Sequence, residues 1–119
     1  MQFNIVAPID IDFLKKIIGD DVAFEKELYE IFLDNSRYNI SKTESSMISG
    51  DNNAWYMASH ALKGSSSSIG AFDFAQVLEE SQKNSDSDIE TKHKIFERTR
   101  EEFRKVENFI LERLKNISI

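Results

Sequence analysis

The sequence predicts an all-α fold: an antiparallel up-down-up-down four-helix bundle with a short additional N-terminal helix. Among 119 residues only four are Gly and one is Pro, so the many tight turns of a β-sheet protein would be hard to build. Apolar residues recur at spacings of three and four through four long stretches, the period of amphipathic helices. Because the segments between these stretches are short, successive long helices should run antiparallel.

The first two helices are predicted from their ends and their apolar positions. Pro8 to Asp10 can open a short helix, which Gly19 would stop. Asp20 and Asp21 then supply the negative charge that favours a helix start, and the second helix should run to about Ile48 before Gly50 ends it. The first carries Phe13, Leu14, Ile17 and Ile18, and the apolar seam of the second is Val22, Phe24, Leu28, Ile31, Phe32, Asn35 and Tyr38.

The last three helices follow the same logic. Asp51 can cap a third helix over roughly residues 52–68, and a fourth should start near Ala71 and decay into residues 83–86. Ser87 followed by Glu90 matches a capping box for the last helix. The fourth helix carries Phe72, Phe74, Ala75, Val77 and Leu78, and the seam of the last is Phe96, Thr99, Phe103, Val106, Ile110, Leu114 and Ile117.

Length and composition limit the possible classes of protein. We expect residues 1–119 to form a single domain, and 40% hydrophobic residues with nine Phe are enough for a core. A net charge of −6 gives no basic footprint for nucleic acid, and no stretch predicts a membrane surface or span. Met1–Val6 lacks the features of a secretory signal, and without Cys there is no disulfide or thiolate chemistry. We therefore expect a cytoplasmic protein or a cytoplasmic domain of a larger chain.

The segment from Ser59 to Ala71 contains several residue types with low helix propensity, although it lies in a predicted helix. It reads Ser-His-Ala-Leu-Lys-Gly-Ser-Ser-Ser-Ser-Ile-Gly-Ala. Gly inside a helix costs roughly 1 kcal/mol relative to Ala, and each Ser adds a few tenths. We interpret the small residues as clearance around the imidazole of His60.

A helical wheel places His60 away from the core. The cluster of Trp55, Ala58, Leu62, Ser65 and Ile69 defines the buried side, and His60 lies about 170° from its centre. Its neighbours on the exposed face are Tyr56, Lys63, Gly64 and Ser67. Gly64, four residues on, leaves the surface beside the ring open, and Lys63 can bring its ammonium to a group attached to His60.

This arrangement suits a nucleophile that accepts an anionic group. Imidazole has an ordinary pKa of about 6.5, so much of it is neutral at physiological pH and can attack phosphorus. Phosphoryl transfer requires mainly positioning and charge neutralisation, and Lys63 offers one positive charge. His60 and Gln82 are equally distant in sequence from Ala71, where the third and fourth helices meet. In an antiparallel pair they should be level, and the Gln82 carboxamide can accept a hydrogen bond from one ring nitrogen or simply face water.

The string from His60 to Ser66, with Gly70 and Ala71, resembles the signature of histidine phosphotransfer (HPt) domains, the shuttles of multistep phosphorelays. The resemblance extends to the helix pattern of nearly the whole chain. It implies that His60 is the phosphoacceptor, Lys63 stabilises the phosphoryl group and Gly64 provides steric clearance. Gln82 matches a position where some members orient the imidazole with a glutamine. Where some relatives carry a further basic residue, this chain has Asp86, with Lys83 nearby.

The resemblance also implies a function and partners. The chain would take a phosphoryl group from an aspartyl phosphate on a receiver domain and pass it reversibly to another receiver aspartate. The receivers, on response regulators and hybrid sensor kinases, would supply the aspartate and Mg²⁺, so this chain needs no cofactor or metal. It would be a phosphotransfer protein without ATP-dependent kinase activity, not an enzyme, and we expect a monomer.

The residues also bear on three other functions. A fragment of an autophosphorylating sensor kinase would place an acidic residue and then a proline after its histidine, but Ala61 follows His60 and the only proline is Pro8. A non-catalytic helical adaptor would use the motif for docking alone. Nothing in His60, Lys63 or Gly64 suggests that the motif has degenerated in this way. A di-metal bundle enzyme needs paired Glu-x-x-His motifs, and Glu90 with His93 stands alone.

The second histidine and one group of apolar residues complete the set of candidate surface residues. His93 lies between two lysines and is interpreted as a surface residue. Phe13, Ile17 and Tyr56 either form an apolar patch near His60 or pack under the first helix.

Overall fold

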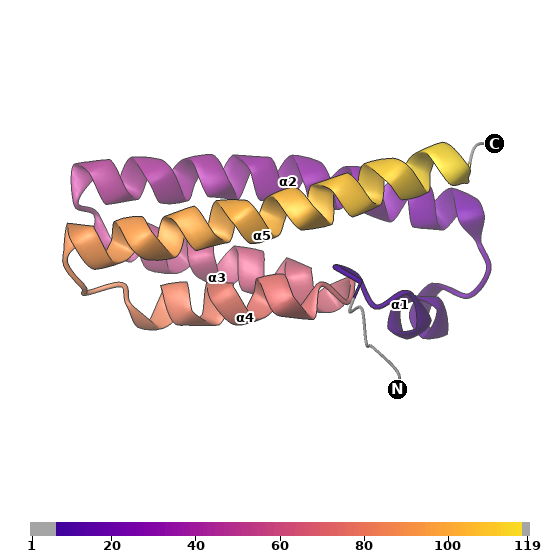
Figure 1. The fold of residues 1–119 in the computed structure, drawn as a ribbon, viewed down its shortest axis with the longest axis horizontal. Helices are drawn as coiled ribbons and strands as arrows, with labels where there is room; N and C mark the ends of the chain where they lie inside the picture. Colours follow the sequence, from indigo (N-terminus) through magenta and orange to yellow (C-terminus); the bar gives the residue numbers. More distant parts are fainter. Residues whose placement is uncertain (1–6, 118–119) are drawn as a thin grey trace, which may run out of the picture.

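The computed structural model describes residues 7–117, and within that range the chain forms five helices and no strand. The all-α prediction is confirmed. Met1–Val6, which the sequence does not mark as a secretory signal, lies outside the described residues. The helices are α1 (Ile11–Ile18), α2 (Val22–Ser49), α3 (Asn52–Ser68), α4 (Phe72–Lys83) and α5 (Ile89–Asn116), shown in Figure 1.

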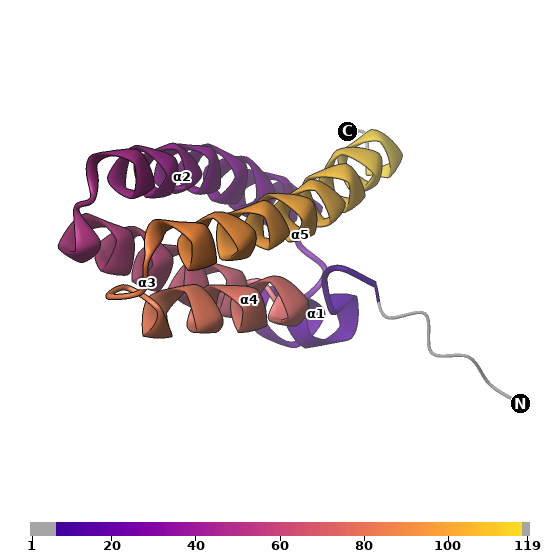
Figure 2. The ribbon, with the colours of Figure 1, turned by 60° about the vertical axis from the view of Figure 1, so that its left-hand side comes forward.

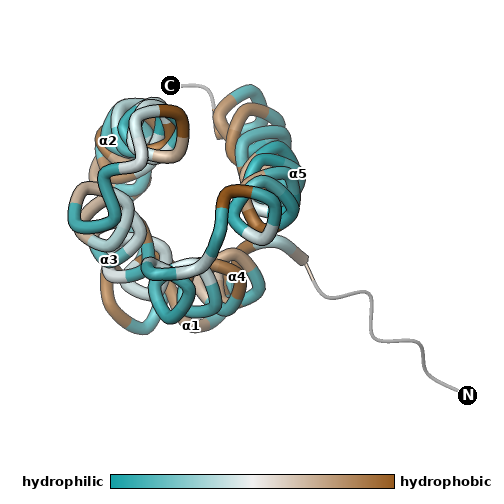
Figure 3. The backbone as a smooth tube through the Cα atoms, turned by 90° about the vertical axis from the view of Figure 1, so that its left-hand side faces the viewer, coloured by the Kyte–Doolittle hydropathy of each residue, from teal (hydrophilic) through white to brown (hydrophobic). Residues whose placement is uncertain are grey.

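The four longer helices contact one another in a closed ring. α2 packs against α3, α3 against α4, α4 against α5, and α5 returns to α2. Figures 1 and 2 show α2 beside α5 and α3 beside α4, and the end-on view in Figure 3 shows the four helices around a common axis. Each of the five helices in the described part of the chain is too short or too polar to traverse a lipid bilayer.

Aspartate side chains begin four of the five helices. Each accepts a hydrogen bond from the backbone N–H three residues on, at 2.8–3.0 Å, which satisfies one of the donors left free in a first helical turn. This chemistry explains why the sequence located these boundaries well. α4 instead follows the buried Ala71 and has no side-chain cap. The capping aspartates are Asp10, Asp21, Asp51 and Asp88.

The predicted capping box at the start of α5 is wrong by one residue. Asp88, not Ser87, accepts the hydrogen bond from the N–H of Thr91. The Ser87 hydroxyl is already engaged, because it donates to Asn84 Oδ1 at 2.7 Å in the preceding turn. The neighbouring carboxylate of Asp88 therefore caps the helix in place of the Ser87 hydroxyl.

The core consists of two apolar clusters, with Ile40 packed against both. The larger gathers side chains from every helix and from the corner between α3 and α4, and the smaller lies where α2, α3 and α5 meet. The larger contains Ile9, Leu14, Tyr29, Phe32, Leu33, Leu62, Ile69, Ala71, Phe74, Leu78, Phe103, Val106 and Ile110, and the smaller contains Met47, Trp55, Ile95 and Phe96.

The seam predicted for α2 is largely wrong. Of its members Phe32 is buried and Leu28 half-buried, but Val22, Phe24, Ile31, Asn35 and Tyr38 are exposed. The buried face instead carries polar groups together with Tyr29, Leu33 and Met47. Thr43 and Ser46 can lie there because each hydroxyl donates to a carbonyl of its own helix, at 2.8 and 2.7 Å. Ser36, also buried on this face, has no hydrogen-bond partner among the described residues. Hydropathy alone cannot recognise a buried face that carries this many polar side chains.

Predictions for the other helices need only small corrections. The predicted seam residues Phe96, Thr99, Phe103, Val106 and Ile110 of α5 are buried as expected, while Leu114 and Ile117 are half-buried. In α4 Phe72 is exposed, and in α3 Ser65 is only half-buried. These residues lie near helix ends or at the edge of a buried face, where neighbouring helices cover less of the surface.

A partly buried ion pair joins the first turn of α2 to the last turn of α5. Arg113 donates from Nε to Glu25 Oε2 at 2.7 Å and from Nη2 to Oε1 at 3.0 Å, and Tyr29 donates its hydroxyl to the same carboxylate at 2.7 Å. The hydrogen bond from Arg113 is the main cause that holds the pKa of Glu25 below 4.5, against the opposing effect of burial. Burial, and then the bond to Glu25, raises the pKa of Tyr29.

This pair predicts an acid-sensitive contribution to stability. A carboxyl whose pKa is lowered by folding stabilises fully above its unfolded value, and that stabilisation is lost as pH falls through the folded value. We expect Glu25→Gln to lower the free energy of unfolding at pH 7 by about 1–3 kcal/mol. The difference from wild type should shrink as urea unfolding is measured from pH 5 downward. A difference that stays constant from pH 7 to pH 2 would contradict this assignment.

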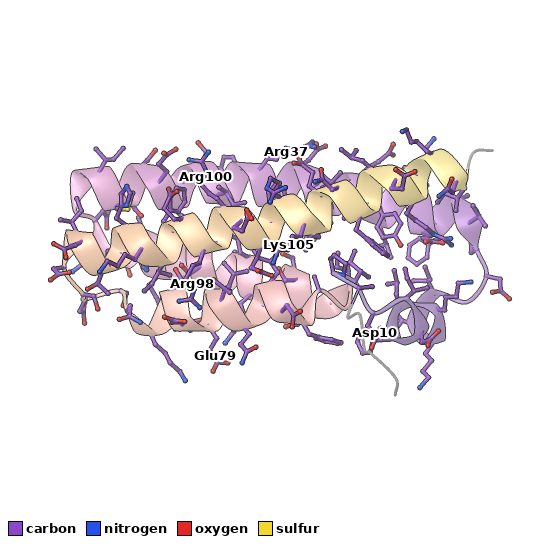
Figure 4. All side chains as sticks on the ribbon, in the orientation of Figure 1. Asp10, Arg37, Glu79, Arg98, Arg100 and Lys105 are labelled. Carbon is purple, nitrogen blue, oxygen red and sulfur yellow. The ribbon has the colours of Figure 1, made fainter. Side chains whose placement is uncertain are left out.

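The segment before α1 is fixed to the corner between α3 and α4. The N–H of Asp10 donates to the carbonyl of Gly70 at 2.9 Å, and the rings of Phe13 and Phe72 meet edge to face at 5.0 Å. Figure 4 shows Asp10 at this corner. Gly70 has φ of +84°, and a Cβ built there would lie 3.0 Å from the Asp10 carbonyl oxygen and 3.1 Å from the Phe13 ring.

Gly70→Ala should therefore destabilise the protein. The added methyl group meets backbone as well as a ring, and a left-handed conformation alone costs an L-residue about 1–2 kcal/mol. We expect a loss of at least this size in urea unfolding. Gly50→Ala, at a site with a left-handed backbone (φ +76°) but open space, provides the matched control and should cost less. Equal losses at the two sites would show that the contact with Asp10 and Phe13 adds nothing.

Candidate functional site

The candidate site depends on a close contact between α3 and α4. The hydroxyls of Ser59 and Ser81 lie 2.7 Å apart, both in fully buried residues, and Trp55 Nε1 donates to the carbonyl oxygen of Ser81 at 2.7 Å. Small side chains at the crossing let the two helices approach closely, and the hydrogen bonds fix one register. His60 and Gln82 are the next residues along each helix, so this register sets them side by side.

The structure brings Gln82 to His60, as the sequence register predicts. His60 is exposed, and its Nδ1 lies 3.4 Å from Gln82 Oε1. This separation exceeds the usual 2.7–3.2 Å of an N–H···O hydrogen bond, so the contact is a long one. Within residues 7–117 no protein group is hydrogen-bonded to His60 Nε2. One ring nitrogen thus faces a protein partner and the other is available.

Tyr56 completes the cluster, and its link to Gln82 was missed at the level of sequence. Gln82 Nε2 donates to the Tyr56 hydroxyl oxygen at 3.1 Å. The rings of Tyr56 and His60 are nearly parallel, with 10° between their planes and 5.9 Å between their centroids. The wheel places Tyr56 on the face of His60, but only the packing of α3 on α4 shows that it reaches Gln82.

Gly64 faces open space. It is exposed, and a Cβ built on it would find no atom within 4 Å. The fold itself therefore does not require glycine here, in contrast to Gly70 six residues on. Glycine weakens a helix, and packing does not require it here. Gly64 is therefore consistent with steric clearance for a molecule that approaches the face of His60.

The serines after Gly64 serve the helix more than the imidazole. Ser65, Ser66 and Ser68 each donate to carbonyl oxygens of the preceding turn, with Ser66 bonded to Leu62 at 2.7 Å and Ser68 to Gly64 at 2.9 Å. Ser66 is fully buried. The interpretation of the whole serine run as clearance is therefore too broad, because it ignored these bonds. Gly64 and the exposed Ser67 are the small residues that share the face of His60.

Lys63 is half-buried and forms no ion pair with a carboxylate among the described residues. The charge of Lys63 acts on Glu79 of α4, whose pKa is lowered chiefly by its hydrogen bond with Lys83 and to a smaller extent by the charge of Lys63. Lys83 Nζ lies 3.1 Å from Glu79 Oε2, and Figure 4 shows Glu79 projecting from α4 away from α5. Lys63 is thus a cation close to His60 in sequence whose ammonium group is not held by a salt bridge.

The other residues considered in the sequence lie apart from the cluster. Asp86 follows the end of α4, so it does not continue the helical face of Gln82. Of the residues proposed for an apolar patch, Tyr56 stacks on His60, Phe13 packs against Phe72 at the α3–α4 corner, and Ile17 is exposed. His93 is exposed on α5, as the sequence predicts.

Comparison of the chain with protein-family models, curated proteins and solved structures found no match. The functional argument therefore depends on the residues of the site and on the geometry described above.

Gly64 provides a test that is independent of any partner. Because a methyl group meets nothing at this site and removes the helix penalty of glycine, Gly64→Ala should raise the free energy of unfolding by roughly 0.5–1 kcal/mol. Urea unfolding monitored by circular dichroism measures this change. A destabilised Gly64→Ala variant would mean that the glycine serves the fold, and the clearance interpretation would be lost.

Proposed function

We propose that this chain is a phosphorelay intermediate of the histidine phosphotransfer type, with His60 as the phosphoacceptor. The observation that carries the proposal is an exposed imidazole with a carboxamide oxygen at Nδ1, no protein partner at Nε2, and open space at Gly64 on the same helical face. Lys63 lies three residues on, near enough in a helix to reach a group on His60.

We also infer that the four long helices form an antiparallel up-down-up-down bundle with α1 across one end. Three observations support this arrangement. Consecutive helices are in contact, the connections between α2, α3, α4 and α5 are short, and the last helix packs against the first of the four. The contact between His60 and Gln82, equally distant from Ala71 in sequence, is the register that an antiparallel α3–α4 pair produces.

The proposed transfer needs a lone pair on Nε2. This pair forms the new N–P bond while the P–O bond to the aspartyl carboxylate of the donor receiver breaks, and the bonding electrons leave on the carboxylate oxygen. Nδ1 keeps its proton throughout, so no general base is required. The ring becomes positively charged as the bond forms, and an oxygen acceptor at Nδ1 stabilises that charge.

The remaining requirements of the transfer would be met partly by this chain and partly by the receiver domain. Lys63 would neutralise charge on the phosphoryl oxygens, and Gly64 would leave room for the receiver to approach. The receiver would supply the aspartate and Mg²⁺, so this chain would need no cofactor and no kinase activity of its own. Such a protein would operate in the cytoplasm, and the closed ring of helices gives it no need of a second copy.

Exposed apolar side chains favour a protein partner over a small anion. Met57, three residues before His60 on α3, is 60% exposed, and Ile31 and Tyr38 on the neighbouring α2 are 60% and 61% exposed. Large apolar side chains in contact with water are typical of surfaces that dock another protein. Met57, close to one helical turn before His60, would give a receiver an apolar contact beside the phosphoacceptor.

A non-catalytic adaptor is the second candidate, since the same apolar side chains would suit docking alone. The contact of Gln82 with Nδ1 argues against it, because an adaptor has no need to orient an exposed imidazole. Binding to a receiver without any transfer of label would favour the adaptor.

The two histidines of the chain provide the decisive test. Incubation with a receiver domain carrying a radiolabelled aspartyl phosphate should transfer an acid-labile, base-stable label to this protein. We expect His60→Gln to abolish the label and His93→Gln, an exposed control on α5, to leave it unchanged. Labelling that persists in His60→Gln would rule out the assignment, and labelling by ATP alone would indicate a kinase.

A further inference from the structure

We propose that Tyr56 is a positioning residue that selects the tautomer of His60 through Gln82. The inference rests on the proposed function, because it concerns which ring nitrogen is free to accept the phosphoryl group. It adds a residue that the resemblance to phosphotransfer domains does not include. Three contacts form a closed cluster: Tyr56 with Gln82, Gln82 with His60, and His60 with Tyr56.

The first step concerns the orientation of the Gln82 carboxamide. Its NH₂ group donates to the Tyr56 hydroxyl oxygen at 3.1 Å, which turns its oxygen toward His60. A carboxamide oxygen can only accept a hydrogen bond. Nδ1 must therefore carry the proton for the contact to be favourable, and Nε2 then holds the lone pair.

The opposite orientation would have the opposite consequence. If the tyrosine hydroxyl donated to the carboxamide oxygen, the NH₂ group would face Nδ1, which would have to be unprotonated. The proton of a neutral ring would then lie on Nε2, and that nitrogen could not attack phosphorus. The phosphorylated state favours the first orientation as well, because a ring phosphorylated on Nε2 retains its proton on Nδ1 and needs an acceptor there.

The second contact of Tyr56 fixes the ring itself. Its phenol ring lies nearly parallel to the imidazole, at a centroid separation typical of offset aromatic pairs. This limits rotation of an otherwise exposed side chain. Tyr56→Phe removes the hydroxyl and preserves the aromatic ring, so it separates control of the carboxamide from control of the ring plane.

The tautomer can be measured without any phosphoryl donor. We propose ¹⁵N NMR of the imidazole nitrogens in the unphosphorylated protein at about pH 8.5, where imidazole is neutral. His93, exposed in the same chain, is an internal reference. We expect wild-type His60 to be enriched in the Nδ1–H tautomer relative to His93, and Tyr56→Phe to move it toward the His93 ratio. A His60 ratio equal to that of His93 in the wild type would overturn the proposal.

A double-mutant comparison tests whether Tyr56 acts through Gln82. Gln82→Ala should lose the Nδ1–H enrichment, and adding Tyr56→Phe to it should change the tautomer ratio no further. The initial rate of labelling by a phosphorylated receiver should fall in Tyr56→Phe in proportion to the lost Nδ1–H fraction. A tautomer change of the same size in the Gln82→Ala background would show that Tyr56 acts independently of Gln82 and would reject the mechanism.

The two readouts also separate this inference from the proposed function. The wild-type tautomer ratio requires no transfer, so it can support the positioning role even if no receiver labels the chain. Labelling of His60 with no Nδ1–H enrichment would keep the phosphoacceptor and remove the role of Tyr56.

Discussion

The close crossing of α3 and α4 at Ser59 and Ser81 is the constraint on which the rest of the site depends. Two small hydroxyl side chains 2.7 Å apart, together with the bond from Trp55 to the Ser81 carbonyl, are buried behind the surface cluster. A slip of one residue would separate the hydroxyls and turn Gln82 about 100° away from His60. The buried polar contacts thus set the geometry of an exposed functional group.

The motif around His60 combines residues that serve the fold with residues that do not. Gly70 is required by its own backbone conformation and by the carbonyl oxygen of Asp10, whereas Gly64 meets nothing. Ser66 is bonded to its own helix and buried, whereas Ser67 is exposed on the face of His60. The sequence does not separate these two groups of residues. The structure does, and it identifies Gly64 and Ser67 as the small residues of the motif that face solvent beside His60.

Much of the helical framework could be predicted, because its boundaries are set by local chemistry. Aspartate caps and terminal glycines act within a few residues, so α1, α2 and α3 begin and end close to the predicted positions. The buried face of α2 could not be predicted in the same way. The hydroxyl of Tyr29 is buried because it donates to Glu25, which is in turn bonded to Arg113 near the C-terminal end of α5. The hydroxyl of Thr43 is satisfied by a carbonyl oxygen of its own helix.

For the site, the sequence by itself determined the identity of the nucleophile candidate, its exposure on α3, the neighbouring cation and the level of Gln82. These follow from helical periodicity and from one turn position, which are properties of short stretches of chain. Tertiary structure alone decided that Gln82 contacts both His60 and Tyr56. It also decided that Lys83 pairs with Glu79, while Lys63 forms no ion pair within residues 7–117. The physical reason is that hydrogen bonds between helices depend on register and side-chain direction to within about an ångström, which periodicity does not specify.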